Sequence, residues 1–260
     1  MIHVNTLQVT SLQVGARLLP LSFRCKAGEV LHVIGPNGSG KSTLLAALAG
    51  VIESKGMVQI GDVNVNVNIN EVSLETLSLH RAYLSQSDKP AFNLQVFQYL
   101  SLAIPSCAEL HSEPVNQAVN DITHLLNIED KLHRSIHQLS GGEWQRVRLA
   151  GICLQIWPSI NPYAKLLILD EPSAPLDIAQ EVLLYRLIEH IAQQGIVVIM
   201  ANHDLNRTLR HADSALLLER GVLQSLGKVE TVLSSERLSQ VFQTQVKHVD
   251  VEGKPYLIFD

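Results

Sequence analysis

The chain has 260 residues, of which 46% are hydrophobic and 17% charged, and its formal net charge is -5. This composition is typical of a globular protein with a sizeable core and differs from that of a disordered chain. The negative charge argues against a surface devoted to nucleic-acid phosphates, and the longest apolar runs, such as residues 196–201, are too short to cross a bilayer. We therefore expect no nucleic acid among the partners, and we expect any membrane role to come through another protein.

The three cysteines, Cys25, Cys107 and Cys153, lie far apart and form no CxxC pair. Their spacing favours free, buried thiols in a reducing compartment over disulfides or a zinc site. No signal peptide is recognisable at the start of the sequence, so we expect the protein in the cytoplasm.

The first part of the chain indicates antiparallel β structure. Residues 1–34 alternate between apolar and polar types, with turns expected near Gly15 and Gly28. Residues 57–60, a turn at Gly61 and the run VNVNVNIN (63–70) predict another hairpin, whose asparagines form a polar solvent face without chemistry. These segments predict a small antiparallel subdomain.

Residues 35–43 read GPNGSGKST and match the GxxxxGK(S/T) phosphate loop at every specified position. The apolar run Val30–Ile34 predicts a buried strand before the loop, and residues 41–49 predict a helix that ends at Gly50. Backbone N–H groups of such a loop and the positive helix N-terminus bind nucleotide phosphates. The candidate residues are Gly35, Pro36, Asn37, Gly38, Ser39, Gly40, Lys41, Ser42 and Thr43. Lys41 would contact the β- and γ-phosphates and Ser42 would bind Mg²⁺.

A helical segment follows the next predicted strand. A short helix leads into a strand that ends at Ser85 and Gln86, and helical patterns then occupy residues 94–104 and 115–126. None of this stretch has the pattern of a buried strand, so we interpret residues 87–155 as an inserted helical subdomain.

The motif LSGGEWQRVRLA (139–150) ends this segment. Ser140 and Glu143 form a capping box, after which apolar residues fall on one helical face. A well-capped core helix explains these features, but not Gly141 and Gly142, which lower helix propensity in the first turn. We therefore expect something to approach the backbone there and predict a second anion site at this helix N-terminus.

Two further strands bring polar residues to the same predicted edge of the sheet. Leu166–Asp170 is apolar until Asp170, which Glu171 follows, and residues 196–201 precede His203. Because ligands bind at the carboxyl ends of parallel strands, Asp170 would hold Mg²⁺ and Glu171 would polarise the attacking water. His203 either bonds the γ-phosphate or water, or caps the next helix. The remainder, with hairpins at 215–227 and around 252–255 and a helix near 237–242, is interpreted as scaffold.

With the phosphate loop, Gln86, LSGGEWQR, LLILDEP, the SAPLD stretch ending at Asp177 and His203 all in order, the chain resembles the ATP-binding subunits of ABC transporters. The resemblance covers nearly the whole chain. HRAYLSQ (80–86), GGEWQRVRLA (141–150) and HDLNRTLRHAD (203–213) are further similar to the ATPases of bacterial vitamin B12 importers.

This resemblance implies an α/β fold, an ABC ATPase with a P-loop NTPase core of mixed sheet, an N-terminal antiparallel β subdomain and an inserted α-helical subdomain. Residues 1–260 would form one ABC ATPase domain, with a core and antiparallel subdomain at 1–86 and 156–260 and the helical subdomain at 87–155. It also implies an ATPase powering import on the cytoplasmic face of the bacterial inner membrane. The expected partners are two polytopic permease subunits and, through them, a periplasmic substrate-binding protein.

The resemblance further implies that two copies pair head to tail as a homodimer. The signature residues of one copy, Ser140, Gly141, Gly142 and Glu143, would then close over the ATP that Lys41 of the other copy holds. Asp177 would bridge the copies, His203 would hold the γ-phosphate, and Mg²⁺ would be bound by Ser42, Gln86 and Asp170.

Two positions depart from the family pattern. Many members stack an aromatic side chain on adenine, but no Tyr, Phe or Trp precedes Phe23, so either Arg17 stacks on the base or the base contact is weak. Pro175 replaces a small flexible residue and is expected to stiffen the contact made by Asp177.

Three other interpretations of the sequence can be compared with a vitamin B12 importer. An importer of an iron-siderophore complex or haem fits the same residues, because the membrane subunits and binding protein select the substrate. A soluble ABC-type ATPase acting on nucleic acid is disfavoured by the charge and by the lack of a long coiled-coil insertion. A P-loop kinase or GTPase has no support, since no NKxD motif occurs and the SGG helix would be unexplained.

Overall fold

A computed structural model describes residues 5–61, 66–86 and 90–260. Its strands are β1 (Asn5–Val14), β2 (Leu18–Lys26), β3 (Val30–Ile34), β4 (Lys55–Gly61), β5 (Asn66–Asn68), β6 (Arg81–Leu84), β7 (Leu166–Asp170), β8 (Val197–Ala201), β9 (Ser214–Glu219), β10 (Val222–Lys228), β11 (Val246–Val251) and β12 (Lys254–Phe259). The α-helices are α1 (Lys41–Leu48), α2 (Leu74–His80), α3 (Val96–Ser101), α4 (Glu113–Leu125), α5 (Gly141–Gln155), α6 (Ile178–Gln193), α7 (Leu205–His211), α8 (Val229–Val232) and α9 (Ser235–Phe242). Short 3₁₀ helices occupy Glu129–Lys131 and Ile136–Gln138.

The central sheet has the order β10-β9-β3-β8-β7-β6 in the described part of the chain. All neighbouring pairs from β9 to β6 are parallel, and only β10 is antiparallel. Strands β3, β7 and β8 are buried at every position, as expected for parallel strands that are covered on both faces. Their carboxyl ends therefore meet at one edge of the sheet, followed by the phosphate loop, Glu171 and Asn202.

Side chains that alternate along β7 enter two different cores, one on each face of the central sheet. Leu166 and Ile168 face α1 and the antiparallel sheet β2-β1-β4-β5, while Leu167 and Leu169 face α5 and α6. A third core joins α7, α8, α9 and the hairpin β11–β12. The expected α/β fold with a mixed sheet, an antiparallel β unit and a helical segment is confirmed.

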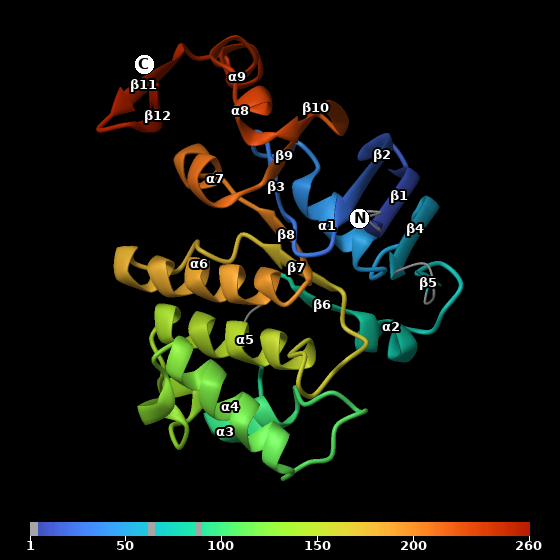
Figure 1. Cartoon of the computed structure of the whole chain (residues 1–260), viewed down its shortest axis with the longest axis vertical. Coiled ribbons are helices and arrows are strands. Elements are labelled where there is room, and N and C mark those ends of the chain that lie inside the picture. Colours follow the sequence, from blue (N-terminus) through green and yellow to red (C-terminus); the bar gives the residue numbers. More distant parts are fainter. Residues whose placement is uncertain (1–4, 62–65, 87–89) are drawn as a thin grey trace.

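Helices α3, α4 and α5 lie together with α6 on one side of the central sheet, where α5 also contacts β6 (Figure 1). Helix α5 is buried on more than the one face predicted for it, since Gln145, Arg146 and Leu149 are buried as well as Val147. It is enclosed by α3, α4 and β6. The division at residues 87 and 155 stays a prediction, and residues 87–89 lie outside the described part.

Two smaller predictions need revision. Of the expected strand at residues 63–70, the structure describes β5 (Asn66–Asn68), while residues 62–65 lie outside the described part. Cys25 and Cys153 are buried free thiols as expected, but Cys107 is exposed, so the prediction of buried thiols is wrong for this residue. It lies on the connection from α3 to α4, which runs over the surface.

Candidate functional site

The phosphate loop connects β3 to α1 and is shaped by its glycines. Gly35 has φ 147° and Gly40 has φ 104°, which are left-handed conformations that residues with a Cβ rarely adopt. A Cβ on Gly35 would lie 2.1 Å from the carbonyl oxygen of Leu218 on β9. The loop is therefore held against the neighbouring strand, with the N-terminus of α1 directly behind it.

Lys41 is folded back onto this loop. Its Nζ donates to the carbonyl oxygens of Gly35 at 2.9 Å and Pro36 at 3.2 Å, and the residue is only 5% exposed. Burial lowers the pKa of Lys41, although the nearby carboxylates of Glu171 and Asp170 oppose this shift. The ammonium is thus fixed at the loop, where it can exchange carbonyl partners for phosphate oxygens.

A cavity of about 420 Å³ opens in front of the loop. Its wall consists of Ala16, Arg17, Asn37, Gly38, Ser39, Gly40, Lys41, Ser42, Thr43, Glu171 and Arg220. Gly35 and Pro36 are not part of the wall, although both contact Lys41. Arg17 therefore belongs to the same cavity wall as the phosphate loop, while its stacking on adenine stays a prediction.

Arg220 was missed from the sequence because it appeared only as the turn of a hairpin. The adjacent Gly221 donates its N–H to the Ser39 carbonyl at 2.9 Å and accepts from the Leu19 N–H at 2.8 Å. These bonds join the β9–β10 turn to both the phosphate loop and the start of β2. No local sequence signal identifies such a long-range contact.

Ser42 and Asp170 meet beneath the cavity. The Ser42 hydroxyl donates to Asp170 Oδ1 at 3.2 Å. Burial raises the pKa of Asp170, while the bond from Ser42 opposes this shift. The pair places a hydroxyl and a buried carboxylate next to the phosphate loop.

Glu171 is the centre of a second cluster at the same edge. Its Oε2 accepts from Gln86 Nε2 at 2.8 Å, and its Oε1 accepts from His203 Nε2. Glu171 has φ 51°, an uncommon backbone conformation for a residue with a Cβ. The alternative role for His203 as a helix cap is wrong, because Asp204 caps α7 by accepting from the Arg207 N–H at 3.0 Å.

The signature segment forms the predicted capping box at the start of α5. Ser140 Oγ accepts from the Glu143 N–H at 3.2 Å, and Glu143 Oε2 accepts from the Ser140 N–H at 2.8 Å. A Cβ on Gly142 would lie 2.2 Å from Oε1 of Gln180, the end of a flexible side chain that can move aside. A Cβ on Gly141 would meet nothing within 4 Å. Contacts within the chain therefore do not require either glycine, and the approach of a ligand to this backbone stays a prediction.

The structure does not bring every predicted site residue to the cavity. Among the described residues, the wall of the phosphate-loop cavity includes none of the signature residues. Asp177 is exposed and caps α6, where its Oδ1 accepts from the Gln180 N–H at 2.8 Å. The side chain of Asp177 is therefore engaged at the start of α6 rather than at the phosphate loop.

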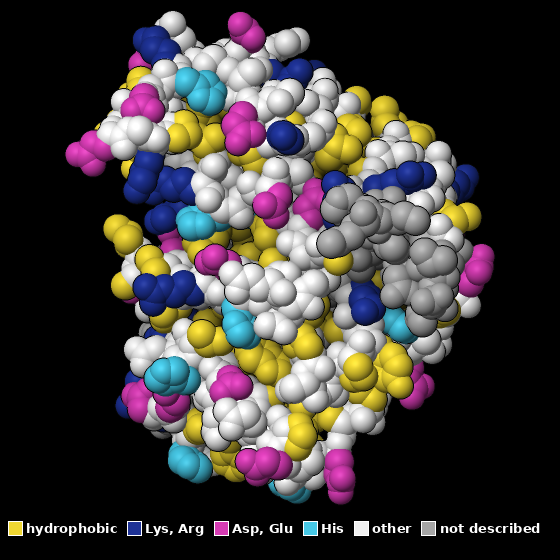
Figure 2. Space-filling view, viewed as in Figure 1, with side chains coloured by type: hydrophobic (Ala, Val, Ile, Leu, Met, Phe, Trp, Pro, Cys, Tyr) yellow, Lys and Arg dark blue, Asp and Glu magenta, His cyan; other side chains and the backbone are white. Residues whose placement is uncertain are grey.

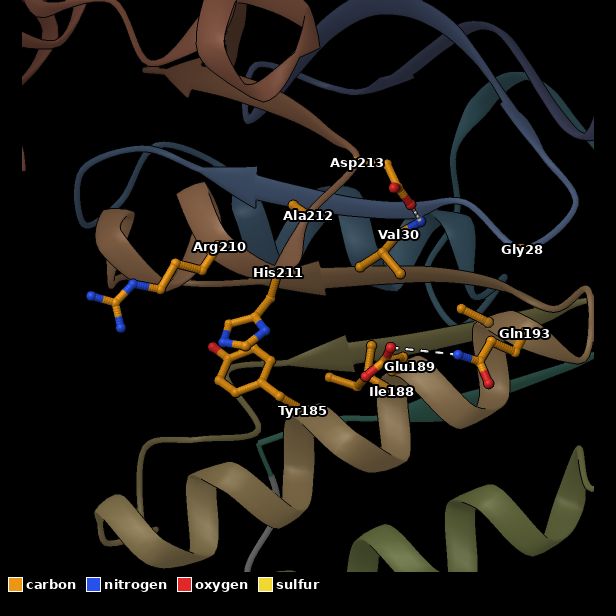
Figure 3. A pocket seen from close by; sticks show the side chains of 11 residues that line it. Gly28, Val30, Tyr185, Ile188, Glu189, Gln193, Arg210, His211, Ala212 and Asp213 are labelled. Atoms are coloured by element: carbon orange, nitrogen blue, oxygen red, sulfur yellow. Dashed lines mark hydrogen bonds between the residues drawn. The ribbon is translucent and has the colours of Figure 1, made fainter. Parts of the chain in front are cut away.

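A separate cavity of about 430 Å³ lies at the opposite end of β3, near Gly28 and Val30 (Figure 3). In it, the rings of His211 and Tyr185 are stacked with centroids 3.9 Å apart. The Tyr185 hydroxyl accepts from Asn202 Nδ2 at 3.1 Å, next to His203 in sequence. Although distinct from the phosphate-loop cavity, this region therefore supports the segment that carries His203.

Comparison with known proteins places these observations in a family. The model of a family described as ABC transporter matches residues 18–174. The chain is 64% identical over 254 residues to the vitamin B12 import ATP-binding protein BtuD of Vibrio atlanticus, covering 97% of this chain and 99% of that protein. It is 63% identical over 254 residues to the protein of the same name from Vibrio cholerae, covering 98% of this chain and 100% of that protein.

Solved structures agree on the fold. An ATP-binding subunit of an ABC transporter superposes with a TM-score of 0.75 at 24% identity, covering 87% of this chain and 91% of that one. An ATP-binding cassette of an ABC transporter in its ADP conformation gives a TM-score of 0.74 at 19% identity, covering 92% and 98%. The chain therefore belongs to the family of ABC transporter ATP-binding domains, which couple ATP hydrolysis to transport.

Proposed function

We propose that this protein is the ATPase subunit of a bacterial vitamin B12 importer, and that it hydrolyses ATP with Glu171 as the group that activates water. The observation that carries the proposal is the placement of Glu171. It belongs to the wall of the phosphate-loop cavity and is bonded on both carboxylate oxygens, by Gln86 and His203. A carboxylate held this way is ready to accept a proton from water at the γ-phosphate.

The other residues of the site bind the nucleotide. The phosphate loop and Lys41 hold the phosphates, and His203 holds the γ-phosphate across the site. Arg17 is proposed to stack on adenine, because it is in the cavity wall and no aromatic residue is among the wall residues that the structure describes. Arg220, on the facing turn, adds a second guanidinium to the same wall.

The donor set also fits Mg²⁺. A Ser42 hydroxyl, the buried Asp170 carboxylate and the side-chain oxygen of Gln86 are hard oxygen donors, as this cation prefers. No cluster of three or more His, Cys, Asp or Glu side chains suited to a metal occurs in the described ranges, so the phosphates and water would complete the coordination. A Mg²⁺ ion held by these residues would neutralise part of the phosphate charge.

A head-to-tail homodimer explains why the signature helix is capped yet remote from the cavity of its own chain. The N-terminus of α5, with Gly141 in open space, offers backbone N–H groups to a phosphate on a second copy. Asp177 and Pro175, close to the exposed Ile178, would lie in the same interface. Two symmetric composite sites result.

Subunits of this family work with membrane permeases. Within residues 5–61, 66–86 and 90–260, no helix combines the length and apolar character that a bilayer crossing requires. Large apolar side chains are exposed around α3, including Phe92 at 61% and Leu102 at 72%, and Figure 2 shows exposed hydrophobic atoms on this lower part of the molecule. We propose that this surface contacts one of two permease subunits at the cytoplasmic face of the inner membrane, with a periplasmic binding protein on the other side.

The choice of vitamin B12 over an iron-siderophore complex or haem rests on the relatives from Vibrio. The chain, its co-purified permease and the binding protein should be reconstituted in vesicles. Uptake of cobalamin that depends on ATP, without uptake of haem or a siderophore complex, is the expected result. Transport of haem or siderophore instead would contradict the substrate, but not the ATPase.

Glu171→Gln tests the chemistry. It keeps the size of the side chain and one acceptor oxygen but removes the base, so hydrolysis should fall by about 10²–10⁴-fold while ATP binding remains. Lys41→Ala is the matched opposite, since it should weaken ATP binding itself. Binding is measured with a fluorescent ATP analogue and hydrolysis by phosphate release. Hydrolysis by the Glu171 variant at the wild-type rate would remove this residue as the base.

The same Glu171→Gln variant tests the dimer. Because ATP cannot be consumed, the nucleotide should hold two copies together, and sedimentation should show a dimer with ATP and a monomer without it. Gly141→Trp, which fills the open space at the signature helix, should prevent this dimer. An ATP-loaded variant that stays monomeric, alone and with its permease, would contradict the head-to-tail arrangement.

A further inference from the structure

Helix α5 is joined by side chains to both loops that follow β6 and β7. Gln145, only 4% exposed, donates from Nε2 to the carbonyl oxygen of Pro172 at 2.8 Å. Three residues later on the same helix, Arg148 donates from Nη1 to Gln145 Oε1 at 3.0 Å and from Nη2 to the carbonyl oxygen of Ser85. Two side chains of one helix therefore connect two backbone carbonyls that lie 87 positions apart in the sequence.

These carbonyls belong to the residues next to Gln86 and Glu171. Because Gln86 donates to Glu171 Oε2 at 2.8 Å, the contacts form a closed ring. The ring begins at the carboxyl end of β6, passes through Arg148 and Gln145 of α5 to the carboxyl end of β7, and closes through the bond between Glu171 and Gln86. The side of the ring that faces the cavity carries the chemistry, and the opposite side is α5.

We propose that Gln145 and Arg148 are positioning residues for ATP hydrolysis, which hold the loops of Gln86 and Glu171 at the separation that keeps Glu171 oriented. This inference rests on the proposed function and assigns to α5 a role that the capping box and signature glycines do not cover. Neither residue reaches the wall of the phosphate-loop cavity. They act through the backbone of the two loops.

The backbone of Glu171 makes such support necessary. With φ 51°, the residue is held in an uncommon conformation that persists only where its surroundings fix it. The bond from Gln145 fixes the carbonyl of the very next residue, Pro172. A loss of that bond would free the peptide between Pro172 and Ser173 and with it the chain that follows Glu171, and a shift of about 1 Å in a reacting group can lower turnover by about 100-fold.

The guanidinium of Arg148 is suited to joining the Gln145 side chain and the Ser85 carbonyl. A planar fork with several N–H groups can serve two acceptors at once, here the Gln145 amide oxygen and the Ser85 carbonyl oxygen. A lysine ammonium is a single point on a flexible stem and cannot reproduce this geometry. The ring therefore depends on arginine rather than on positive charge alone.

The ring also connects the two faces of the proposed dimer site. Helix α5 runs without interruption from the signature glycines to Gln155, so the ring residues and the capping box move together. A displacement of the signature helix against a second copy would then alter the separation of the Gln86 and Glu171 loops. Hydrolysis in one composite site would depend on the seating of the signature in the other.

The test compares Arg148→Ala, Arg148→Lys and Gln145→Glu in the full-length chain with its co-purified permease, measuring kcat, KM and equilibrium ATP binding. Gln145→Glu keeps an acceptor for Arg148 but has no N–H for Pro172. We expect kcat to fall by about tenfold to 100-fold in all three variants, with ATP affinity within about twofold of wild type. The double variant of Arg148→Ala with Gln145→Glu should be no slower than the slower single one, because one ring is broken in each case.

Arg146→Ala provides the matched control. Arg146 lies on the same helix and also donates to carbonyls, those of Leu126 and Asn127, but it is outside the ring. Its variant should lower thermal stability and leave kcat within about twofold of wild type at a temperature where it is folded. Should Arg148→Ala be insoluble, Arg148→Lys and Gln145→Glu decide the matter, since both retain side-chain volume.

The proposal is overturned if Arg148→Lys and Gln145→Glu keep the wild-type kcat, if kcat and ATP affinity fall in parallel, or if Arg146→Ala slows turnover equally. Failure of the proposed function is distinguishable from these results. It would appear as a wild-type complex without ATP hydrolysis, or as unchanged hydrolysis in Glu171→Gln. Neither result depends on the ring.

Discussion

A buried histidine in the centre of the sheet makes the stability of this protein sensitive to mild acid. His32, on β3, is fully buried and contacts α7 through Nδ1, which lies 3.0 Å from Thr208 Oγ1. The Thr208 hydroxyl donates its own proton to the Asp204 carbonyl at 3.1 Å, so it must accept from His32. His32 is therefore the tautomer protonated at Nδ1, and its Nε2 has no partner among the described residues.

Charging this ring would place a proton on Nε2 with nothing to receive its hydrogen bond. Burial lowers the pKa of His32 from 6.5 to about 3, and the nearby His211 adds to this shift. An unfolded chain binds the proton below pH 6.5, whereas the folded chain does not until about pH 3. The unfolded state thus binds more protons in this window, and stability falls as the pH falls.

The magnitude follows from the difference between the two pKa values. Relative to neutral pH, the loss is about 1.3 kcal/mol at pH 5.5 and about 2.6 kcal/mol at pH 4.5, from this one group. His32→Gln should remove this contribution, so the free energy of unfolding should decline less steeply with acid than in wild type. His133→Gln is the matched control, because His133 is exposed, and it should leave the slope unchanged.

Two measurements check the reasoning. Urea denaturation between pH 7.5 and 4.5 gives the slopes for wild type and both variants, and NMR of the ring Cε1–H signals follows each histidine directly. The signal of His32, assigned by its absence in His32→Gln, should not titrate above pH 5. A midpoint near 6.5 for that signal would refute the assignment of a buried neutral ring.

Two further predictions concern a glycine and the thiols. Gly35→Ala should destabilise the fold by about 1–3 kcal/mol and weaken ATP binding, because its Cβ would collide with the Leu218 carbonyl. Gly38→Ala should destabilise the fold less, because a Cβ at that position would meet nothing within 4 Å. Equal losses in urea denaturation would contradict this. Cys107 should react with a thiol reagent in the folded protein, while Cys153, whose pKa burial raises to about 12, should react only after unfolding. Rapid labelling of more than one thiol before unfolding would disprove that order.

Much of the candidate site could be predicted because its residues follow strands whose burial is visible in the sequence. The apolar runs before Gly35, Glu171 and Asn202 identify three parallel strands, and parallel strands place their carboxyl ends at one edge. The structure confirms these strands within one residue at each end. Local patterns sufficed here because each apolar run in the sequence is itself the buried strand.

Contacts between distant segments could not be predicted in this way. Arg220 reaches the cavity because its turn bonds the phosphate loop, and the Gln180 side chain of another helix occupies the space next to Gly142. The sequence at Arg220 indicates only a hairpin turn, and the sequence at Gly142 does not show which helix packs beside it. Cys107 was misjudged because a lone cysteine carries no local information on exposure.

Phosphate binding and chemistry are supported by different parts of this fold. Lys41 is held by carbonyls of its own loop, which β9 and the β9–β10 turn keep in place. Glu171 depends instead on the β6 end and on α5, through Gln86 and Gln145. A change confined to α5 can therefore alter turnover while leaving the phosphate loop intact.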